Sequence, residues 1–190
     1  MIKTIDDAIE FYAGREQQFS SFGASVLKRR PSALNELTQV AKDLGLPQDY
    51  VNSTNHLILE GVTLGFFELS PGDTSDICAS LLMLNGQSRN PVLPSTLIHV
   101  AAFEADVIAV TKGSLGHGDS TVYFVDITTS PEVQVKPLAQ SFDDFIVLAS
   151  ALDQAILEGS DDPERVIADL ATKQPEGSVE TWKIIASMMV

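Results

Sequence analysis

The sequence predicts a single α+β domain in which a mixed, mainly antiparallel sheet packs against helices. Apolar residues recur at helical spacing in the first quarter of the chain, whereas residues 97 to 138 alternate with a period of two. Helix-start signals return after residue 140. With 190 residues, the chain has the length of one domain and can bury a proper core.

Two helices are expected before residue 47. Apolar residues from Ile5 to Tyr12 follow Thr4, whose hydroxyl can cap the free amides of a first turn. A second apolar stripe runs from Leu34 to Leu44 and ends at Gly45, a natural C-cap. Residues 48 to 61 favour neither helix nor strand.

A strand and a short helix follow. Residues 63 to 69 combine β-branched and aromatic side chains and end in a Ser-Pro-Gly turn, as a strand does. Asp73 or Thr74 can then cap a helix whose apolar stripe ends near Asn85.

Four short strands with brief connections are expected next, which is typical of an antiparallel meander. The glycine-rich link over residues 112 to 120 reads as a long hairpin tip. The four strands are 97–102, 106–111, 121–127 and 133–138.

The chain is expected to end in helices. Ser141, with two acidic residues just behind it, opens the best-signalled helix of the chain. Asp162-Pro163 and Ser178 can begin two more. We therefore expect an α+β domain over residues 1–158 and a C-terminal helical extension over 159–190, packed on the same domain.

The charge is the one extreme of the composition. Twenty-six acidic and 12 basic residues give a formal net charge of −14, and such a field repels nucleic acid and anionic membranes. Residues 1–50 hold seven acids and six bases, so residues 51–190 hold the remaining 19 and six. Solubility alone and an acidic face for a basic partner both account for this excess.

A cytoplasmic location is expected from three features. Cys78 is the only cysteine, so no internal disulfide forms. The first residues include two acids where a signal peptide would need an apolar run, and the apolar stretch from Phe145 to Leu152 is too short to span a membrane.

The order of these motifs resembles the SUKH superfamily, which joins a Smi/Knr-like fungal cell-wall regulator to bacterial immunity proteins that neutralise toxins. The resemblance spans roughly residues 5 to 155. Residues 52–62 depart from the family pattern, because they keep only Gly61 of the glycines and asparagine expected there. The motifs that carry the resemblance are Leu44-Gly45-Leu46-Pro47 with Asp49-Tyr50, Gly65-Phe66-Phe67-Glu68-Leu69, Val122-Tyr123-Phe124-Val125-Asp126 and Ser141-Phe142-Asp143-Asp144-Phe145.

The resemblance implies a mixed sheet packed on helices and a role in protein binding rather than catalysis. The sequence itself agrees with a role in binding, because it contains no recognisable catalytic or metal-ligating group of residues. None of His56, His99 and His117 has a second ligand at metal-site spacing, and the loop 113–118 lacks the Lys-Ser/Thr and the following helix of a phosphate loop. We therefore expect no enzyme activity, no cofactor and no metal.

Acidic residues at predicted strand ends and loops are the candidate contacts for a basic partner, since opposed charges speed encounter and set orientation. A solvated acidic surface is the plainer alternative. The hairpin tip adds one exposed histidine. The candidate partner-binding residues are Glu68, Asp73, Asp76, His117, Asp119 and Asp126.

Three functions fit these observations. The first is an immunity-type protein that binds and blocks a basic toxin domain, possibly a nuclease. The second is a regulatory scaffold of the cell-wall-regulator kind, and the third is a hydrolytic or ligand-binding domain with a pocket at His117, Asp119 and Asp126. A homodimer through Trp182, Ile185 and Met189 of the last helix is a further expectation.

Overall fold

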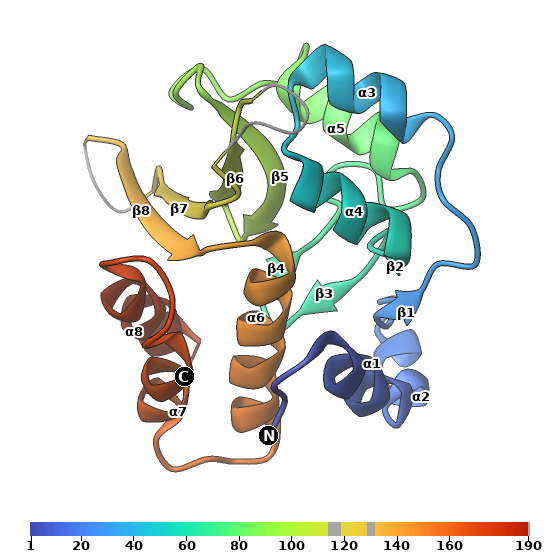
Figure 1. The fold of residues 1–190 in the computed structure, drawn as a ribbon. Helices are drawn as coiled ribbons and strands as arrows, with labels where there is room; N and C mark the ends of the chain where they lie inside the picture. The colour runs from blue at the N-terminus through green and yellow to red at the C-terminus, as the bar shows by residue number, and fades with distance from the viewer. Residues whose placement is uncertain (114–118, 129–131, 190) are drawn as a thin grey trace.

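The computed structural model describes residues 1–113, 119–128 and 132–189. Within these ranges the chain forms eight α-helices, a two-stranded sheet and a six-stranded sheet, so the predicted α+β class is confirmed (Figure 1).

The large sheet is a meander in which spatial order equals chain order and every neighbouring pair is antiparallel. The four predicted strands are confirmed, and two short strands extend the sheet at one edge. Its strands are β3 (Thr63–Leu64), β4 (Phe67–Glu68), β5 (Leu97–Phe103), β6 (Asp106–Thr111), β7 (Val122–Asp126) and β8 (Gln134–Ala139). The small sheet pairs β1 (Lys28–Arg29) with β2 (Leu57–Ile58).

The residues of β6 show why this sheet has two buried faces. Ile108 and Val110 point into the main core, and Val107 and Ala109 point into a second, smaller cluster that includes Leu93. Side chains of a strand alternate between faces, so the near-continuous burial of β5 and β6 reflects cover on both sides.

The helices surround the sheet, and α6 runs through the middle of the molecule (Figure 1). It contacts β3 and β8 of the sheet, α1 and α4 on one side and α7 on the other. The helices are α1 (Ile5–Ala13), α2 (Glu16–Ser21), α3 (Leu37–Leu44), α4 (Gln48–His56), α5 (Ile77–Asn85), α6 (Phe142–Leu157), α7 (Pro163–Ala171) and α8 (Ser178–Met188).

Two stretches differ from the sequence-based expectation. Residues 63–69 do not form one strand, because the chain reverses at Gly65, whose φ of +61° suits glycine, and Leu64 pairs with Phe67. Residues 48–61, which favoured neither state, form α4 followed directly by β2.

The helix caps agree with the sequence at Thr4, Gly45 and Ser141. Thr4 forms a reciprocal capping box with Asp7, Gly45 adopts φ +77°, and the Ser141 hydroxyl accepts from the amide of Asp144. Neither Asp73 nor Thr74 caps α5, because Asp76 takes that position. Gly177, and not Ser178, is the N-cap of α8.

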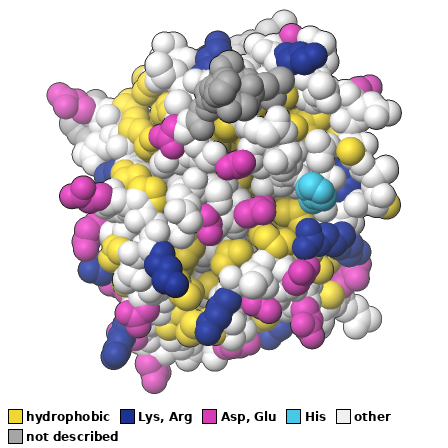
Figure 2. All heavy atoms as spheres, in the orientation of Figure 1, with side chains coloured by type: hydrophobic (Ala, Val, Ile, Leu, Met, Phe, Trp, Pro, Cys, Tyr) yellow, Lys and Arg dark blue, Asp and Glu magenta, His cyan; other side chains and the backbone are white. Residues whose placement is uncertain are grey.

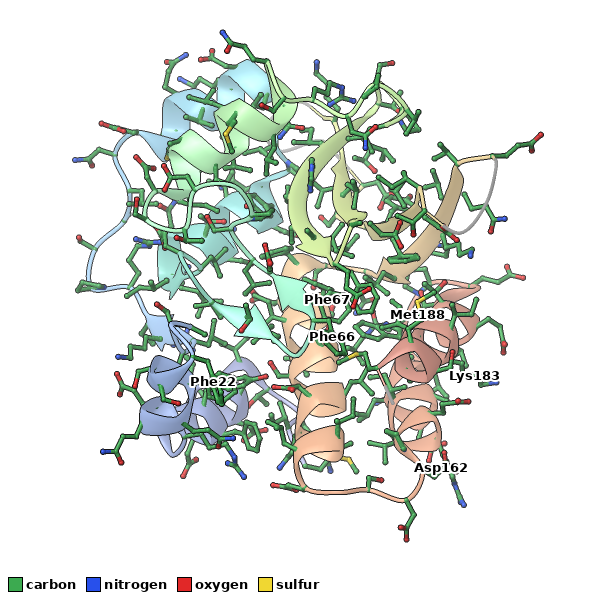
Figure 3. The ribbon with its side chains drawn as sticks, turned by 180° about the vertical axis from the view of Figure 1, so that it is seen from behind. Phe22, Phe66, Phe67, Asp162, Lys183 and Met188 are labelled. Carbon is green, nitrogen blue, oxygen red and sulfur yellow. The ribbon has the colours of Figure 1, made fainter. Side chains whose placement is uncertain are left out.

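The C-terminal helices belong to the same core as the rest of the domain. The Trp182 ring is fully buried against Phe67 and Phe145, and its indole N–H donates to the carbonyl of Leu138 at 2.8 Å. Ile185 and Met189 are also buried, so these side chains cannot contact a second copy. A dimer through α8 would have to use its exposed residues, such as Met188 (Figure 3).

None of the helices in the described part of the chain combines the length and the apolar character needed to cross a membrane.

Candidate functional site

Three of the six predicted contact residues lie around the loop between β4 and α5. Glu68 ends β4, and Asp73 and Asp76 lie in the loop itself. The Asp73 carboxylate accepts hydrogen bonds from the amides of Ser75 and Asp76, at 2.9 and 3.1 Å. Asp76 in turn caps α5 through the amide of Cys78 at 2.8 Å. The loop is therefore held by its own carboxylates.

These hydrogen bonds keep the loop anionic. The hydroxyl and amide of Ser75 lower the pKa of Asp73, so that this carboxyl stays ionised to lower pH. Glu68 differs from its two neighbours, because its carboxylate has no hydrogen-bond or ion-pair partner within the described ranges and its side chain is exposed, although its backbone pairs with Thr63 and Ala102 in the sheet. Of the three, Glu68 is the carboxylate left open to a partner.

Glu68 lines a surface groove of about 300 Å³ between the α2–β1 connection and the β3–β4 hairpin, together with Gly61 and Thr74. Phe22, which follows α2, also lines this groove and is 81% exposed (Figure 3). Phenylalanine is among the residue types most often buried in folded proteins, and aromatic side chains are enriched at protein interfaces.

A second hollow, of about 490 Å³, lies on the other side of the loop and is lined by Glu36, Asp76 and Cys78. Burial, followed by the charges of Asp76 and Glu36, raises the pKa of the Cys78 thiol to about 11, so this cysteine is a poor nucleophile. We call Glu36, Glu68, Asp73 and Asp76 the acidic loop surface.

The described residues that line these two grooves include one cation, Arg30, which is neutralised within the chain. Its guanidinium donates to both carboxylate oxygens of Glu60, at 2.9 and 2.7 Å, and to the backbone carbonyls of Thr54 and Leu57. The four carboxylates of the acidic loop surface therefore keep their negative field. On the face seen in Figure 2, acidic side chains are interspersed with basic ones.

The other predicted contacts do not join this surface. Asp126 is only 3% exposed and pairs with Lys136 at 3.6 Å, so little of its side chain is open to a partner. Asp119 is exposed, and its carboxylate accepts a hydrogen bond from the amide of Thr121 at 2.9 Å. The hydroxyl and amide of Thr121 lower the pKa of the Asp119 carboxyl. Asp119 and Asp126 lie at opposite ends of β7, so they do not share a pocket. His117 lies outside the described residues.

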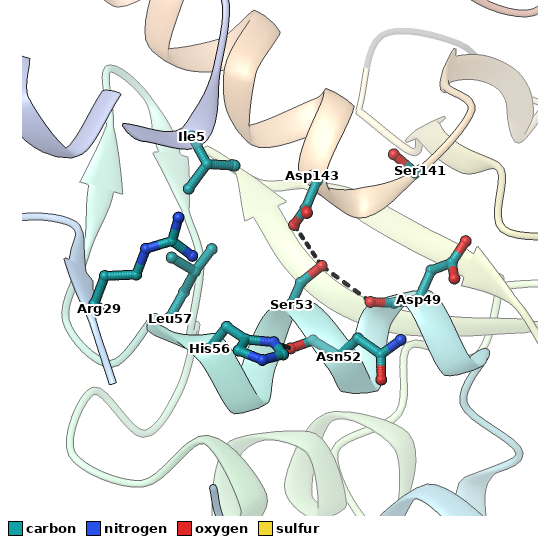
Figure 4. A pocket seen from close by; sticks show the side chains of 9 residues that line it. All are labelled: Ile5, Arg29, Asp49, Asn52, Ser53, His56, Leu57, Ser141 and Asp143. Atoms are coloured by element: carbon teal, nitrogen blue, oxygen red, sulfur yellow. Dashed lines mark hydrogen bonds between the residues drawn. The ribbon is translucent and has the colours of Figure 1, made fainter. Parts of the chain in front are cut away.

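A polar pocket of about 310 Å³, which the sequence did not predict, lies where α4, β1 and the start of α6 meet (Figure 4). Its lining combines two carboxylates, one arginine, one histidine, hydroxyl and amide groups, and two apolar side chains. These residues are Ile5, Arg29, Asp49, Asn52, Ser53, His56, Leu57, Ser141 and Asp143.

Hydrogen bonds fix the central groups of this pocket. The nearly buried Ser53 hydroxyl lies 2.6 Å from a carboxylate oxygen of Asp143 and 2.9 Å from the carbonyl of Asp49. Nδ1 of His56 lies 2.7 Å from the carbonyl oxygen of Asn52 and must donate to it, because a carbonyl only accepts. Ser53 is therefore tied to a carboxylate and not to the histidine, and no serine–histidine pair of a hydrolase is formed.

The sequence contains the spacing of these pocket residues, but the spacing has a meaning only once residues 48–56 are known to form a helix. Residues 49, 52, 53 and 56 fall on one face of α4, at helical spacing. His99, by contrast, is a core residue of β5 whose Nε2 has no hydrogen-bond partner among the described residues, and burial lowers the pKa of its ring to about 4.

Comparison with protein-family models, curated proteins and solved structures finds no match. Membership of the SUKH superfamily therefore stays a prediction. Across the described ranges, no group of three or more histidine, cysteine, aspartate or glutamate side chains is arranged to hold a metal ion.

Proposed function

We propose that this chain is a protein-binding module of the immunity type, which neutralises a basic toxin domain by direct binding. The acidic loop surface, next to the exposed ring of Phe22, carries this proposal. Four carboxylates there have no free cation among the described lining residues, so a positively charged protein is the complementary partner.

The two parts of this surface have different physical roles. Carboxylates at the rim, such as Glu68, accelerate encounter through long-range attraction and add little to the lifetime of the complex. A large apolar ring such as that of Phe22 loses contact with water on binding and slows dissociation. A toxin that acts on nucleic acid has a cationic cleft, which fits the role of the carboxylates.

The test is binding to the toxin domains encoded beside the gene for this chain, measured as association and dissociation rates at low and high salt. Glu68→Gln is expected to lower the association rate and to flatten its salt dependence. Phe22→Ala is expected to raise the dissociation rate about tenfold or more, as for a central aromatic contact. Inhibition of the toxin should fall in parallel.

Two exposed residues outside these grooves serve as controls. Glu176→Gln removes one charge from the α7–α8 connection, and Leu157→Ala removes an exposed apolar side chain at the end of α6. Both should leave binding unchanged. Absence of a complex with every neighbouring toxin domain would contradict the proposal, and a complex without inhibition would instead favour a regulatory scaffold.

A further inference from the structure

We propose that the polar pocket between α4, β1 and α6 binds a small zwitterion, a molecule that carries an ammonium group and a carboxylate on a short aliphatic body. The observation behind this proposal is that groups of opposite charge line opposite sides of one cavity: Arg29 comes from β1 and Asp143 from the first turn of α6 (Figure 4).

The arginine side can accept a carboxylate. One terminal nitrogen of Arg29 donates to Asp6 at 2.7 Å, and a guanidinium has five N–H donors, so several stay available. The Asp6 carboxylate is highly exposed, and an ion pair so open to water holds the arginine only weakly. The Nδ2 amide of Asn52 is a second donor, because only its Oδ1 is bonded, by Gln48 at 2.8 Å.

The opposite side can accept an ammonium group. One oxygen of Asp143 is bonded by the Ser53 hydroxyl, which fixes the orientation of the carboxylate and leaves its second oxygen available. Asp49 lines the same side and adds a second negative charge. Nδ1 of His56 donates to a carbonyl, so Nε2 can accept a further hydrogen bond whenever the ring carries that proton alone.

The body of the ligand is defined by what lies between the two charged sides. Ile5 and Leu57 give the cavity an apolar portion, which suits a short run of methylene groups. A volume of about 310 Å³ lies at the lower end of the range for ligand pockets, so the molecule is small.

Charge pairing selects a zwitterion over a simple ion. A plain amine in the cavity would face the guanidinium of Arg29, and a plain carboxylate would face Asp143 and Asp49. Like charges at close range oppose binding, and unpaired charges lose hydration without a replacement. Only a ligand with both charges pairs each side of the pocket.

The proposal is tested by titrating the isotope-labelled chain with zwitterions of increasing span: glycine, β-alanine, 4-aminobutanoate and lysine. Backbone amide shifts of residues 52–57 and 141–144 are followed by NMR. We expect saturable shifts confined to these segments, strongest for the member whose span matches the cavity. Butylamine and butanoate, which each carry one of the two charges, should bind about tenfold or more weakly, since a hydrogen bond to a charged group is worth about 1.5–3 kcal/mol.

Two variants test which side of the pocket binds the carboxylate of the zwitterion and which binds its ammonium group. Arg29→Gln and Asp143→Asn should each weaken the best zwitterion about tenfold or more. Lys28→Gln is the matched control on β1, because Lys28 is also exposed and ion-paired, with Glu16, but does not line the pocket. Glu164→Gln is the control for the loss of one carboxylate in the first turn of a helix, because Glu164 lies in the first turn of α7, is exposed and does not line the pocket.

The proposal is overturned if no zwitterion gives saturable shifts, if butylamine or butanoate binds as tightly, or if the control variants weaken binding as much as the pocket variants. Because the titration uses the chain alone, its outcome does not depend on whether the acidic loop surface binds a toxin.

Discussion

Replacing Tyr12 with phenylalanine should expose the energetic role of a buried carboxylate. The Tyr12 hydroxyl donates to Asp153 at 2.7 Å, and both side chains are at least 95% buried. The bond joins α1 to the middle of α6, the helix that contacts both the sheet and the other helices. Tyr12→Phe removes the hydroxyl with little change in shape.

The expected loss depends on whether Asp153 is charged. A hydrogen bond to an ionised group contributes about 1.5–3 kcal/mol to stability, and one between neutral groups about 0.5–1.5 kcal/mol. Burial raises the pKa of Asp153 above its ordinary 3.8, against the lowering effect of Tyr12. A carboxyl whose pKa is higher in the folded state favours folding when protonated, and this contribution disappears as pH rises through the folded pKa.

The variant should therefore be less stable than the parent by about 1.5–3 kcal/mol where Asp153 is ionised, and by only about 0.5–1.5 kcal/mol once the pH has fallen through the raised pKa of Asp153. Urea denaturation followed by the fluorescence of Trp182, the single tryptophan, measures both values on either side of this pKa. Tyr123→Phe is the matched control, because the Tyr123 hydroxyl bonds Asp119 at an exposed site, and a loss within about 0.5 kcal/mol is expected there. Equal losses in the two variants, or a Tyr12→Phe loss that grows on acidification, would refute the reasoning.

Three further predictions concern the core and a turn. Trp182→Ala should cost about 3–5 kcal/mol in urea denaturation followed by circular dichroism, since this variant has no tryptophan, and a smaller loss would mean that the C-terminal helices are not part of one core. Gly45→Ala should cost at least about 1 kcal/mol, since φ is +77° and the new Cβ would lie 2.7 Å from the carbonyl oxygen of Gly113; unchanged thermal melting would contradict this. His99 should keep neutral-ring NMR shifts down to about pH 5, because its pKa is about 4 in the folded chain. Its contribution to stability is complete above pH 6.5, the pKa of an unperturbed histidine, and is lost as the pH falls from 6.5 to about 4. Titration of the His99 ring near pH 6.5 would contradict the burial.

Local signals in the sequence were sufficient wherever a short-range interaction decides the structure. The Thr4 and Ser141 caps depend on groups within three residues, and the alternation along β6 and β7 follows from the pleat of a strand. The hairpin at Gly65 was missed because the aromatic and β-branched residues around it suit one strand or two equally well. The glycine itself was the only indication of the reversal.

The helix α4 was missed for a different reason. Its buried positions include Ser53 and Thr54, so no apolar stripe marks its face. The Thr54 hydroxyl donates to the carbonyl oxygen of Tyr50, one turn earlier. The Ser53 hydroxyl lies within hydrogen-bond distance of both Asp143 and the carbonyl of Asp49, so both hydroxyls find acceptors inside the protein. The polar pocket was not predicted for the same reason, because its groups come together only when α4, β1 and α6 pack against each other.

The acidic residues show what composition can and cannot indicate about a binding surface. Asp126 is buried and forms an ion pair with Lys136, which lies diagonally across from it on the next strand, a pairing that depends on sheet register. Asp73 and Asp76 bond backbone amides, yet a capped carboxylate is still a charge, and the lowered pKa of Asp73 keeps it ionised. A local structural role and long-range attraction of a basic protein are therefore compatible in the same side chain. Because these caps cannot be neutralised without disturbing the loop, their share in recognition is best measured by adding salt, which screens the exposed field while leaving the short hydrogen bonds in place.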